Sequence, residues 1–163
     1  MRFSFTAEQE EFRATLRRAL ETRSPTKEVR RLMATEAGFE RDAWKKFNQE
    51  MGLTAVAIPE AYGGSGFGFG ELAIVLEEMG RAVTCAPFFS TAAMAANAIL
   101  NAGTEDQKKA TVAKGSKITG AKSYVLDGHT ADLIVVLAGN SLYTADGNAK
   151  GLTRTPLKTM DET

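Results

Sequence analysis

The sequence predicts an α+β protein: an N-terminal all-α helical domain, residues 1–110, followed by a partial antiparallel β-domain, residues 111–163. Two observations carry this prediction. Over the first two-thirds of the chain, apolar side chains recur every three or four residues, which is the period of an amphipathic helix. Beyond Gly115 the period changes to two, and Asp-Gly and Gly-Asn turn dipeptides separate the alternating segments.

The composition is typical of a folded globular protein and limits the possible functions. Of the 163 residues, 44% are hydrophobic and 25% are charged, which excludes an intrinsically disordered chain. Twenty Lys and Arg balance twenty Asp and Glu, so the chain lacks the basic surface that nucleic-acid binding requires. No apolar run approaches the roughly 18 residues of a membrane span, and the N-terminus lacks the apolar core of a secretory signal. We therefore expect a cytoplasmic protein with no membrane span and no nucleic-acid partner.

Cys85 and His129 are the only residues of their types. Their scarcity excludes an intrachain disulfide, a Cys/His zinc site and any catalytic site that needs two histidines. We interpret Cys85 as a small buried residue rather than a reactive thiol. Asp127 and His129 are interpreted as a turn-capping aspartate beside an exposed histidine, rather than an acid–base pair. No metal site is predicted.

The first helix is predicted from a capping box and an apolar stripe. Thr6 and Gln9 have the spacing at which each side chain caps the backbone N–H of the other. The stripe that follows consists of Phe12, Leu16, Ala19 and Leu20. Three arginines lie mostly off this stripe: Arg13, Arg17 and Arg18. Because acidic residues share the helix, we interpret the arginines as a solvated face rather than an anion-binding site.

Three more segments show the helical period before residue 82. They carry, in order, Val29, Leu32 and Met33; Trp44, Phe47 and Met51; and Leu72, Val75, Leu76 and Met79. Gly52 stands where the C-terminus of a helix needs a left-handed residue. The Pro and Gly residues of 53–70 predict a shaped loop. Its run Gly66-Phe-Gly-Phe-Gly70 departs from the G-x-G-x-x-G fingerprint, so we interpret it as a tight turn rather than a phosphate-binding loop.

The remaining elements follow the change of period. Residues 88–100 carry no charge and are apolar on nearly every face, which is typical of a helix buried on all sides. A second capping box, Thr104 with Gln107, predicts the start of another helix. Strands are predicted over residues 116–128, 131–138, 141–145 and 152–157.

Five segments, in order, resemble landmarks of the acyl-CoA dehydrogenase family. Residues 51–66, Met-Gly-Leu-Thr-Ala-Val-Ala-Ile-Pro-Glu-Ala-Tyr-Gly-Gly-Ser-Gly, resemble its G-L-x-x-x-x-x-P-E-x-Y-G-G-x-G loop. The opening Phe-Thr-Ala-Glu-Gln-Glu-Glu-Phe, Leu-Glu-Glu-Met-Gly-Arg at 76–81, Gly-Thr-Glu-Asp-Gln-Lys at 103–108 and residues 120–133 match further landmarks. The resemblance covers nearly the whole chain. Residues 85–91 and 123–129 look most like subgroups that act on bulky or sterol-derived acyl-CoA esters.

The resemblance implies an FAD-dependent enzyme that oxidises the Cα–Cβ bond of an acyl-CoA thioester. It also implies an electron-transfer flavoprotein or similar acceptor, and a homo- or hetero-oligomer, either a dimer or a tetramer. Tyr124, Val125 and Leu126 align with the flavin-facing W-I-T triplet of the family and are the implied cofactor-binding residues. Phe88, Phe89 and Met94 are implied to shape the substrate tunnel. From the residues alone, Tyr124 is equally well a strand aromatic, and the segment after residue 88 is most simply core.

The sequence departs from the family pattern in three places. The family has a longer helix and a T-E-P-x-x-G-S-D-like flavin-binding segment between Thr104 and the strand with Tyr124, and this sequence lacks both. It has no counterpart of the C-terminal four-helix domain that carries the catalytic carboxylate, so no catalytic residue is predicted and we expect the full polypeptide to be longer. Leu126 replaces the Thr whose hydroxyl donates to the flavin.

Two classes of function follow from this sequence. The preferred one is part of an FAD-dependent acyl-CoA dehydrogenase subunit acting in fatty acid or sterol side-chain catabolism. The alternative is a non-catalytic assembly subunit, or a helical interaction module, that keeps the dehydrogenase fold without its chemistry.

Overall fold

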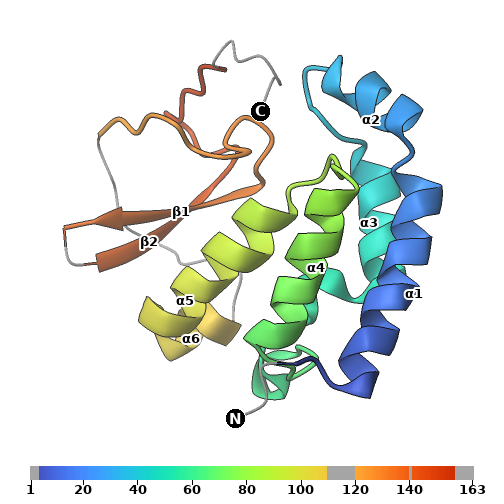
Figure 1. Ribbon diagram of the computed structural model, residues 1–163. Helices are drawn as coiled ribbons and strands as arrows, with labels where there is room; N and C mark the ends of the chain where they lie inside the picture. Colours follow the sequence, from blue (N-terminus) through green and yellow to red (C-terminus); the bar gives the residue numbers. More distant parts are fainter. Residues whose placement is uncertain (1–3, 110–119, 140, 157–163) are drawn as a thin grey trace. The chain divides into compact units, whose positions relative to one another are not determined.

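The computed structural model describes residues 4–109, 120–139 and 141–156 (Figure 1). The chain divides into two compact units, residues 1–86 and residues 87–163. The first unit is helical, and the second combines helices with an antiparallel hairpin. This is the predicted α+β class. The domain boundary expected after residue 110 stays a prediction.

All four helices predicted before residue 82 are present in the first unit. They are α1 (Ala7–Arg23), α2 (Thr26–Met33), α3 (Arg41–Met51) and α4 (Phe69–Arg81). The capping box of α1 is formed: the Thr6 backbone N donates to Gln9 Oε1 at 2.9 Å, and the Gln9 backbone N donates to Thr6 Oγ1 at 3.2 Å. Gly52 ends α3 in the left-handed conformation, with φ of 65°. Local sequence signals therefore set these helix ends.

The core of the first unit lies where α1 packs against α4. Leu16 and Leu20 from α1 and Ile74 and Val75 from α4 are fully buried, as is Leu53 from the loop that follows α3. Burying one such side chain contributes about 1.5–3 kcal/mol. The helical stripes read from the sequence are thus the faces that stabilise this unit.

The loop between α3 and α4 is stabilised by hydrogen bonds within its own backbone. It contains two short 3₁₀ turns, Leu53–Ala55 and Glu60–Tyr62. The backbone N–H groups of Ser65, Gly66 and Phe67 donate to the carbonyls of Ala55, Ile58 and Val56 at 2.9–3.1 Å. A Cβ atom at Gly64 would lie 2.0 Å from the Ile58 carbonyl oxygen, so only glycine fits there. Because these N–H groups are engaged internally, the loop is a tight turn and not a phosphate cradle.

The second unit begins with a helical segment of two types. A π-helix spans Phe89–Ala95 and continues into α5 (Ala96–Ala102); α6 (Glu105–Lys109) follows. The capping box of α6 is present, with the Thr104 backbone N donating to Gln107 Oε1 at 2.8 Å. The predicted helix start at Thr104 is confirmed, and residues 110–119 lie outside the described residues.

The expectation that residues 88–100 are buried on all sides is wrong for the described residues. Phe88 and Ala92 are buried, but Phe89 and Met94 have exposed fractions of 52% and 50%. The uncharged composition indicated burial, whereas in this unit only one face of the helix is covered. An uncharged helix with an open apolar face is typical of a binding surface.

Two of the predicted strands form an antiparallel hairpin. Strand β1 (Leu133–Ala138) pairs with β2 (Ser141–Asp146), with Leu133 opposite Asp146 and Ala138 opposite Ser141. Gly139 adopts φ of 59° next to the turn, a conformation that glycine favours.

The other two predicted strands are absent from the described residues. In the segment 120–128, Tyr124 and Asp127 have φ of 58° and 53°, which breaks the extended backbone. Hydrogen-bonded turns then occupy residues 125–131. Residues 152–156 run without strand pairing, and Arg154 makes side-chain rather than ladder hydrogen bonds to neighbouring carbonyls. The first part of the 116–128 prediction, residues 116–119, lies outside the described residues, as does residue 157.

Candidate functional site

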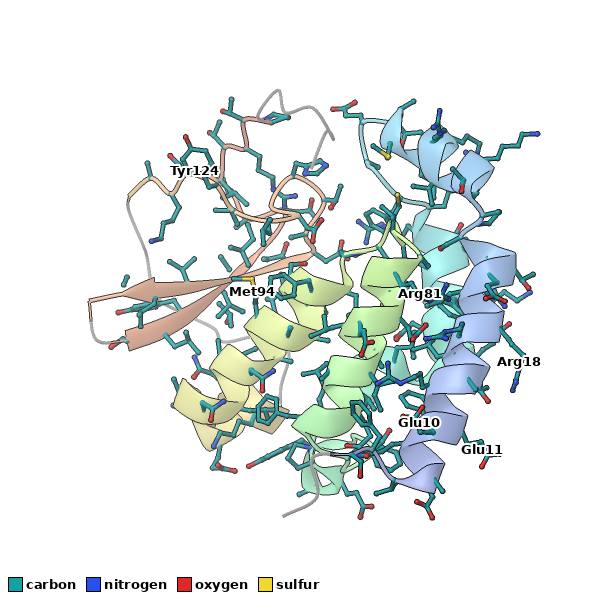
Figure 2. The ribbon with its side chains drawn as sticks, in the orientation of Figure 1. Glu10, Glu11, Arg18, Arg81, Met94 and Tyr124 are labelled. Atoms are coloured by element: carbon teal, nitrogen blue, oxygen red, sulfur yellow. The ribbon has the colours of Figure 1, made fainter. Side chains whose placement is uncertain are left out.

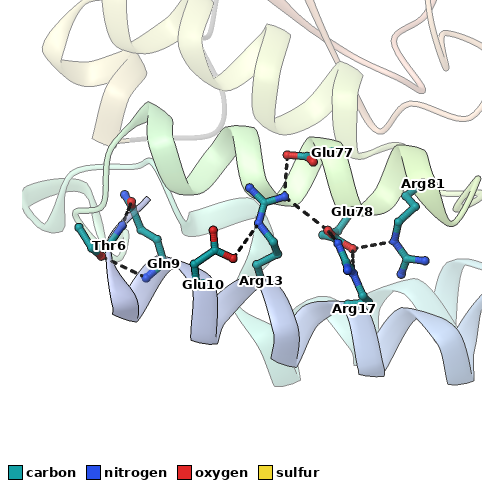
Figure 3. A network of polar contacts seen from close by, with 8 residues as sticks. All are labelled: Thr6, Gln9, Glu10, Arg13, Arg17, Glu77, Glu78 and Arg81. Carbon is teal, nitrogen blue, oxygen red and sulfur yellow. Dashed lines mark hydrogen bonds and ion pairs between the residues drawn. The ribbon is translucent and has the colours of Figure 1, made fainter. Parts of the chain in front are cut away.

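The first unit contains a buried carboxylate enclosed by arginines (Figure 3). Glu78 of α4 is fully buried. It accepts from Arg17 Nε at 2.9 Å and Nη2 at 2.5 Å, and from Arg81 Nε at 2.8 Å. Arg13 lies 3.6 Å away and pairs with Glu77 at 2.7 Å. The interpretation of the α1 arginines as a solvated face is therefore wrong for Arg13 and Arg17, because they pair with acidic residues sixty positions away, and it holds for the exposed Arg18.

This arrangement suits a structural ion pair and not a catalytic base. The hydrogen bonds from Arg17, followed by those from Arg81, lower the pKa of Glu78 to about 2 against the opposing effect of burial. A general base works best with a pKa near the operating pH and within reach of the substrate. The low pKa and complete burial of Glu78 do not suit that task, and its ion pairs join α1 to α4.

A small pocket in the first unit lies between α2, α3 and residues 84–86. Its volume is about 140 Å³, and its lining includes Leu32, Trp44, Phe47 and Cys85. Burial, with the negative charge of Glu28, raises the pKa of the Cys85 thiol. A raised pKa keeps the thiol protonated at neutral pH, which agrees with the prediction that Cys85 is not a reactive nucleophile.

The second unit holds all six residues that the sequence analysis assigned to binding. Phe88 is buried, whereas Phe89 and Met94 present their side chains from the π-helix to solvent. Tyr124 has an exposed fraction of 86%, and Val125 and Leu126 are about half exposed. Figure 2 shows the side chains of Met94 and Tyr124. The predicted substrate and cofactor residues thus expose apolar surface on two segments of one unit.

One hydrogen bond joins these two segments. Ser90, next to Phe89, donates from Oγ to Asp127 Oδ2 at 2.5 Å, and Asp127 follows Leu126 directly. The backbone carbonyl of Asp127 also accepts from the backbone N of Thr130 at 3.1 Å and of Ala131 at 3.0 Å. Because these bonds are made by the backbone, the turn-capping role predicted for the Asp127 side chain stays a prediction. Its link to Ser90 was not predicted, since nothing in the sequence relates residues 37 positions apart.

Arg154 fixes the same loop from its other end. Its guanidinium donates to the carbonyl oxygens of His129 at 2.8 Å, Ala131 at 2.9 Å and Gly147. Gly147 is required here, because a Cβ atom would lie 2.1 Å from the Ala131 carbonyl oxygen. His129 is half-buried rather than exposed as expected, since its backbone is part of this clamp. Sequence reasoning missed Arg154, which belongs to no motif.

Two kinds of functional feature are absent from the described residues. No group of three or more His, Cys, Asp or Glu among them is placed to hold a metal ion. None of the helices in residues 4–109 has the length and apolar character needed to cross a membrane. The consecutive residues Tyr124, Val125 and Leu126 expose one aromatic and two aliphatic side chains, and this exposed apolar surface is termed the apolar wall.

Comparison with known proteins identifies the family. Residues 6–116 match the family described as acyl-CoA dehydrogenase, N-terminal domain. A relative named acyl-CoA dehydrogenase IpdE2 from Mycolicibacterium smegmatis is 31% identical over 96% of this chain and 49% of its own length. IpdE2 from Mycobacterium tuberculosis is 34% identical over 70% of this chain and 37% of its own length. The chain spans half or less of these curated relatives.

Solved structures with the same fold agree with this match. The steroid ACAD Tcur3481–Tcur3483 G363A variant superimposes with a TM-score of 0.77 at 26% identity, over 93% of this chain and 51% of that chain. The ChsE4–ChsE5 complex from Mycobacterium tuberculosis has a TM-score of 0.55 at 29% identity, over 67% of this chain and 27% of that chain. The sequence landmarks, the helical unit and these similarities agree, and the chain belongs to the acyl-CoA dehydrogenase family.

Proposed function

We propose that this chain is part of an FAD-dependent acyl-CoA dehydrogenase subunit that oxidises the Cα–Cβ bond of a sterol-derived acyl-CoA thioester. The observation that carries the proposal is the family match over residues 6–116. The sterol-derived substrate is supported by the similarity to structures named steroid ACAD. The ChsE4–ChsE5 complex supports a hetero-oligomer of two different subunits as the working assembly.

In this proposal the open apolar residues of the second unit form the binding surface. Phe89 and Met94 would line the acyl chain, and Tyr124, Val125 and Leu126 would hold the flavin ring. Their half-exposed to exposed side chains would supply apolar contact area and exclude water when covered. The chemistry that a flavin would supply here is acceptance of the β-hydrogen as hydride, with an electron-transfer flavoprotein or similar protein as the final electron acceptor.

The chain's own residues bind and orient in this scheme, and none removes the α-proton. Glu78 is held ionised by Arg17 and Arg81 and is fully buried, away from any substrate. The base is therefore expected from another domain or subunit. Leu126 carries no hydroxyl, which favours the second candidate, a subunit that keeps the fold for assembly and holds no flavin at this face.

Flavin content and the Leu126→Thr variant discriminate the two candidates in the full-length assembly. If Leu126 faces flavin, the added hydroxyl tightens flavin retention by up to about tenfold, the value of one hydrogen bond. If Leu126 packs against a protein surface, the unpaired hydroxyl lowers stability by about 1–3 kcal/mol and leaves flavin content unchanged. Flavin absorbance and melting temperature of both variants give the answer. A colourless wild-type assembly that is correctly folded would refute the flavoprotein assignment for this subunit.

A further inference from the structure

The loop that carries the apolar wall adopts a conformation that needs support. Tyr124 and Asp127 both lie in the left-handed region, with φ of 58° and 53°. Residues other than glycine rarely adopt this region, although asparagine, aspartate and histidine do so more often than the rest. The aromatic Tyr124 is therefore the unusual residue here, and such a conformation persists where the surroundings enforce it. Residues 124–127 are therefore held by specific contacts, and these contacts determine where Tyr124, Val125 and Leu126 lie.

Ser90 and Asp127 supply one of these contacts at the end next to Leu126. A carboxylate only accepts hydrogen bonds, so the hydroxyl proton of Ser90 points to Asp127 Oδ2 at 2.5 Å. The Pro87 carbonyl oxygen is the more distant neighbour of the same hydroxyl, at 3.3 Å. A hydrogen bond to a charged acceptor is stronger than one between neutral groups.

The helix that presents Ser90 is also fixed in an unusual form. The change from π-helix to α5 frees carbonyl groups, and Asn97 Nδ2 donates to the carbonyls of Ala92 at 3.2 Å and Ala93 at 3.1 Å. π-helical turns occur frequently at functional sites. This turn places Phe89 and Met94 toward solvent and Ser90 against the loop. At the far end of the loop, Arg154 holds the carbonyls of His129 and Ala131.

We propose that Ser90 and Asp127 are a positioning pair that sets the separation between the helix carrying Phe89 and Met94 and the segment carrying Tyr124–Leu126. The inference rests on the proposed function, in which these two segments contact the acyl chain and the flavin. Neither residue touches the reacting atoms. Their hydrogen bond fixes the width of the space between the two apolar surfaces, and thereby the size of acyl group that fits beside the flavin.

Three single variants in the full-length assembly, one double variant and one control test this pair. Ser90→Ala removes the hydroxyl, Ser90→Thr keeps it, and Asp127→Asn keeps a residue that tolerates positive φ while removing the charge. The matched control is Ser24→Ala in the first unit, because Ser24 is also half-buried and donates one side-chain hydrogen bond, to Thr84 Oγ1 at 3.3 Å. The primary readout is hydrogen exchange at the backbone amides of Gly128, Thr130 and Ala131, which are bonded within the loop.

We expect exchange at these amides to be about tenfold faster in Ser90→Ala, which corresponds to about 1.4 kcal/mol, and less accelerated in Asp127→Asn. Ser90→Thr and Ser24→Ala should match wild type at these amides. The dissociation constant for FAD should rise about tenfold in Ser90→Ala and recover in Ser90→Thr. Ser90→Ala should change exchange less in the Asp127→Asn background, because coupled residues are not additive.

The outcomes separate this proposal from the proposed function. Unchanged exchange in Ser90→Ala, or full additivity with Asp127→Asn, would overturn the positioning pair whatever the flavin content. A wild-type assembly without flavin would refute the flavin site, and the exchange measurement would still decide the pair. If Ser90→Ala does not fold, wild-type exchange in the milder Asp127→Asn variant would overturn the pair, and accelerated exchange would support it.

Discussion

The two units of this chain differ in how fully each one buries its apolar side chains and pairs its buried charges. In the first, Leu20 and Ile74 are fully buried, and the buried Glu78 is matched by arginines. In the second, Phe88 and Ala92 are the buried apolar side chains among the described residues, and Leu137 has an exposed fraction of 63%. The first unit also leaves Phe69 open, with an exposed fraction of 70%, so it is distinguished by its packed core and not by an absence of open apolar side chains. A packed core supplies stability, whereas a unit with little core of its own offers apolar surface to a ligand or partner.

Equivalent leucine truncations in the two units test this contrast most strongly. Leu20→Ala should lower the free energy of unfolding by about 2–5 kcal/mol, because it leaves a cavity in a packed core. Leu137→Ala should change it by less than about 0.5 kcal/mol, as expected for an exposed position. Urea denaturation of both variants gives the comparison. A large loss in Leu137→Ala would show that the hairpin is covered in the working assembly.

The buried carboxylate gives the first unit a distinctive pH dependence. Folding lowers the pKa of Glu78 from 4.5 to about 2, with Arg17 as the main cause. Its contribution to the free energy of unfolding is therefore complete above about pH 4.5 and is lost as the pH falls through 2. Glu78→Gln should cost about 1.5–3 kcal/mol at neutral pH and should flatten the acid limb of the stability curve.

The control for that variant is Glu11→Gln, because Glu11 is exposed on α1 (Figure 2). Urea denaturation from pH 7 to pH 2 should give nearly parallel curves for Glu11→Gln and wild type. Equal acid sensitivity of Glu78→Gln and wild type would mean that other carboxylates, and not Glu78, determine the loss of stability at low pH.

The smallest expected difference in stability is between the two capping boxes, because the same motif begins a long packed helix in one unit and a short helix in the other. Thr6→Ala should cost about 1 kcal/mol, because α1 carries part of the core. Thr104→Ala should leave the melting temperature unchanged and accelerate amide exchange only within α6. A comparable loss of melting temperature in both variants would show that α6 contributes to cooperative unfolding.

The local part of this structure was predictable, and the non-local part was not. The Thr6 capping box and Gly52 act through neighbours within four residues, so the helix ends follow directly from the sequence. The pairing of Arg17 with Glu78 depends on how α1 and α4 pack, which the period of each helix does not specify. The positive φ of Tyr124 replaced an expected strand by a loop, because the alternating pattern carries no information on such a conformation.

The candidate site was predictable only as far as the family resemblance reached. That resemblance pointed to Phe88, Phe89 and Met94 and to Tyr124, Val125 and Leu126 as binding residues, and these assignments stay predictions. The contacts of Ser90, Asp127 and Arg154 join segments 23 to 37 residues apart. No sequence pattern predicts these contacts, because each of them forms only once the backbone has turned to bring the two segments together.

The pocket of the first unit provides a spectroscopic signal that comes from that unit alone. Its lining contains the single tryptophan of the chain, Trp44. Tryptophan emission therefore reports on residues 1–86, whereas far-ultraviolet circular dichroism sums the whole chain. Denaturation curves that coincide for the two signals would mean that the two units melt as one. Emission that changes at a different denaturant concentration would give each unit a separate transition.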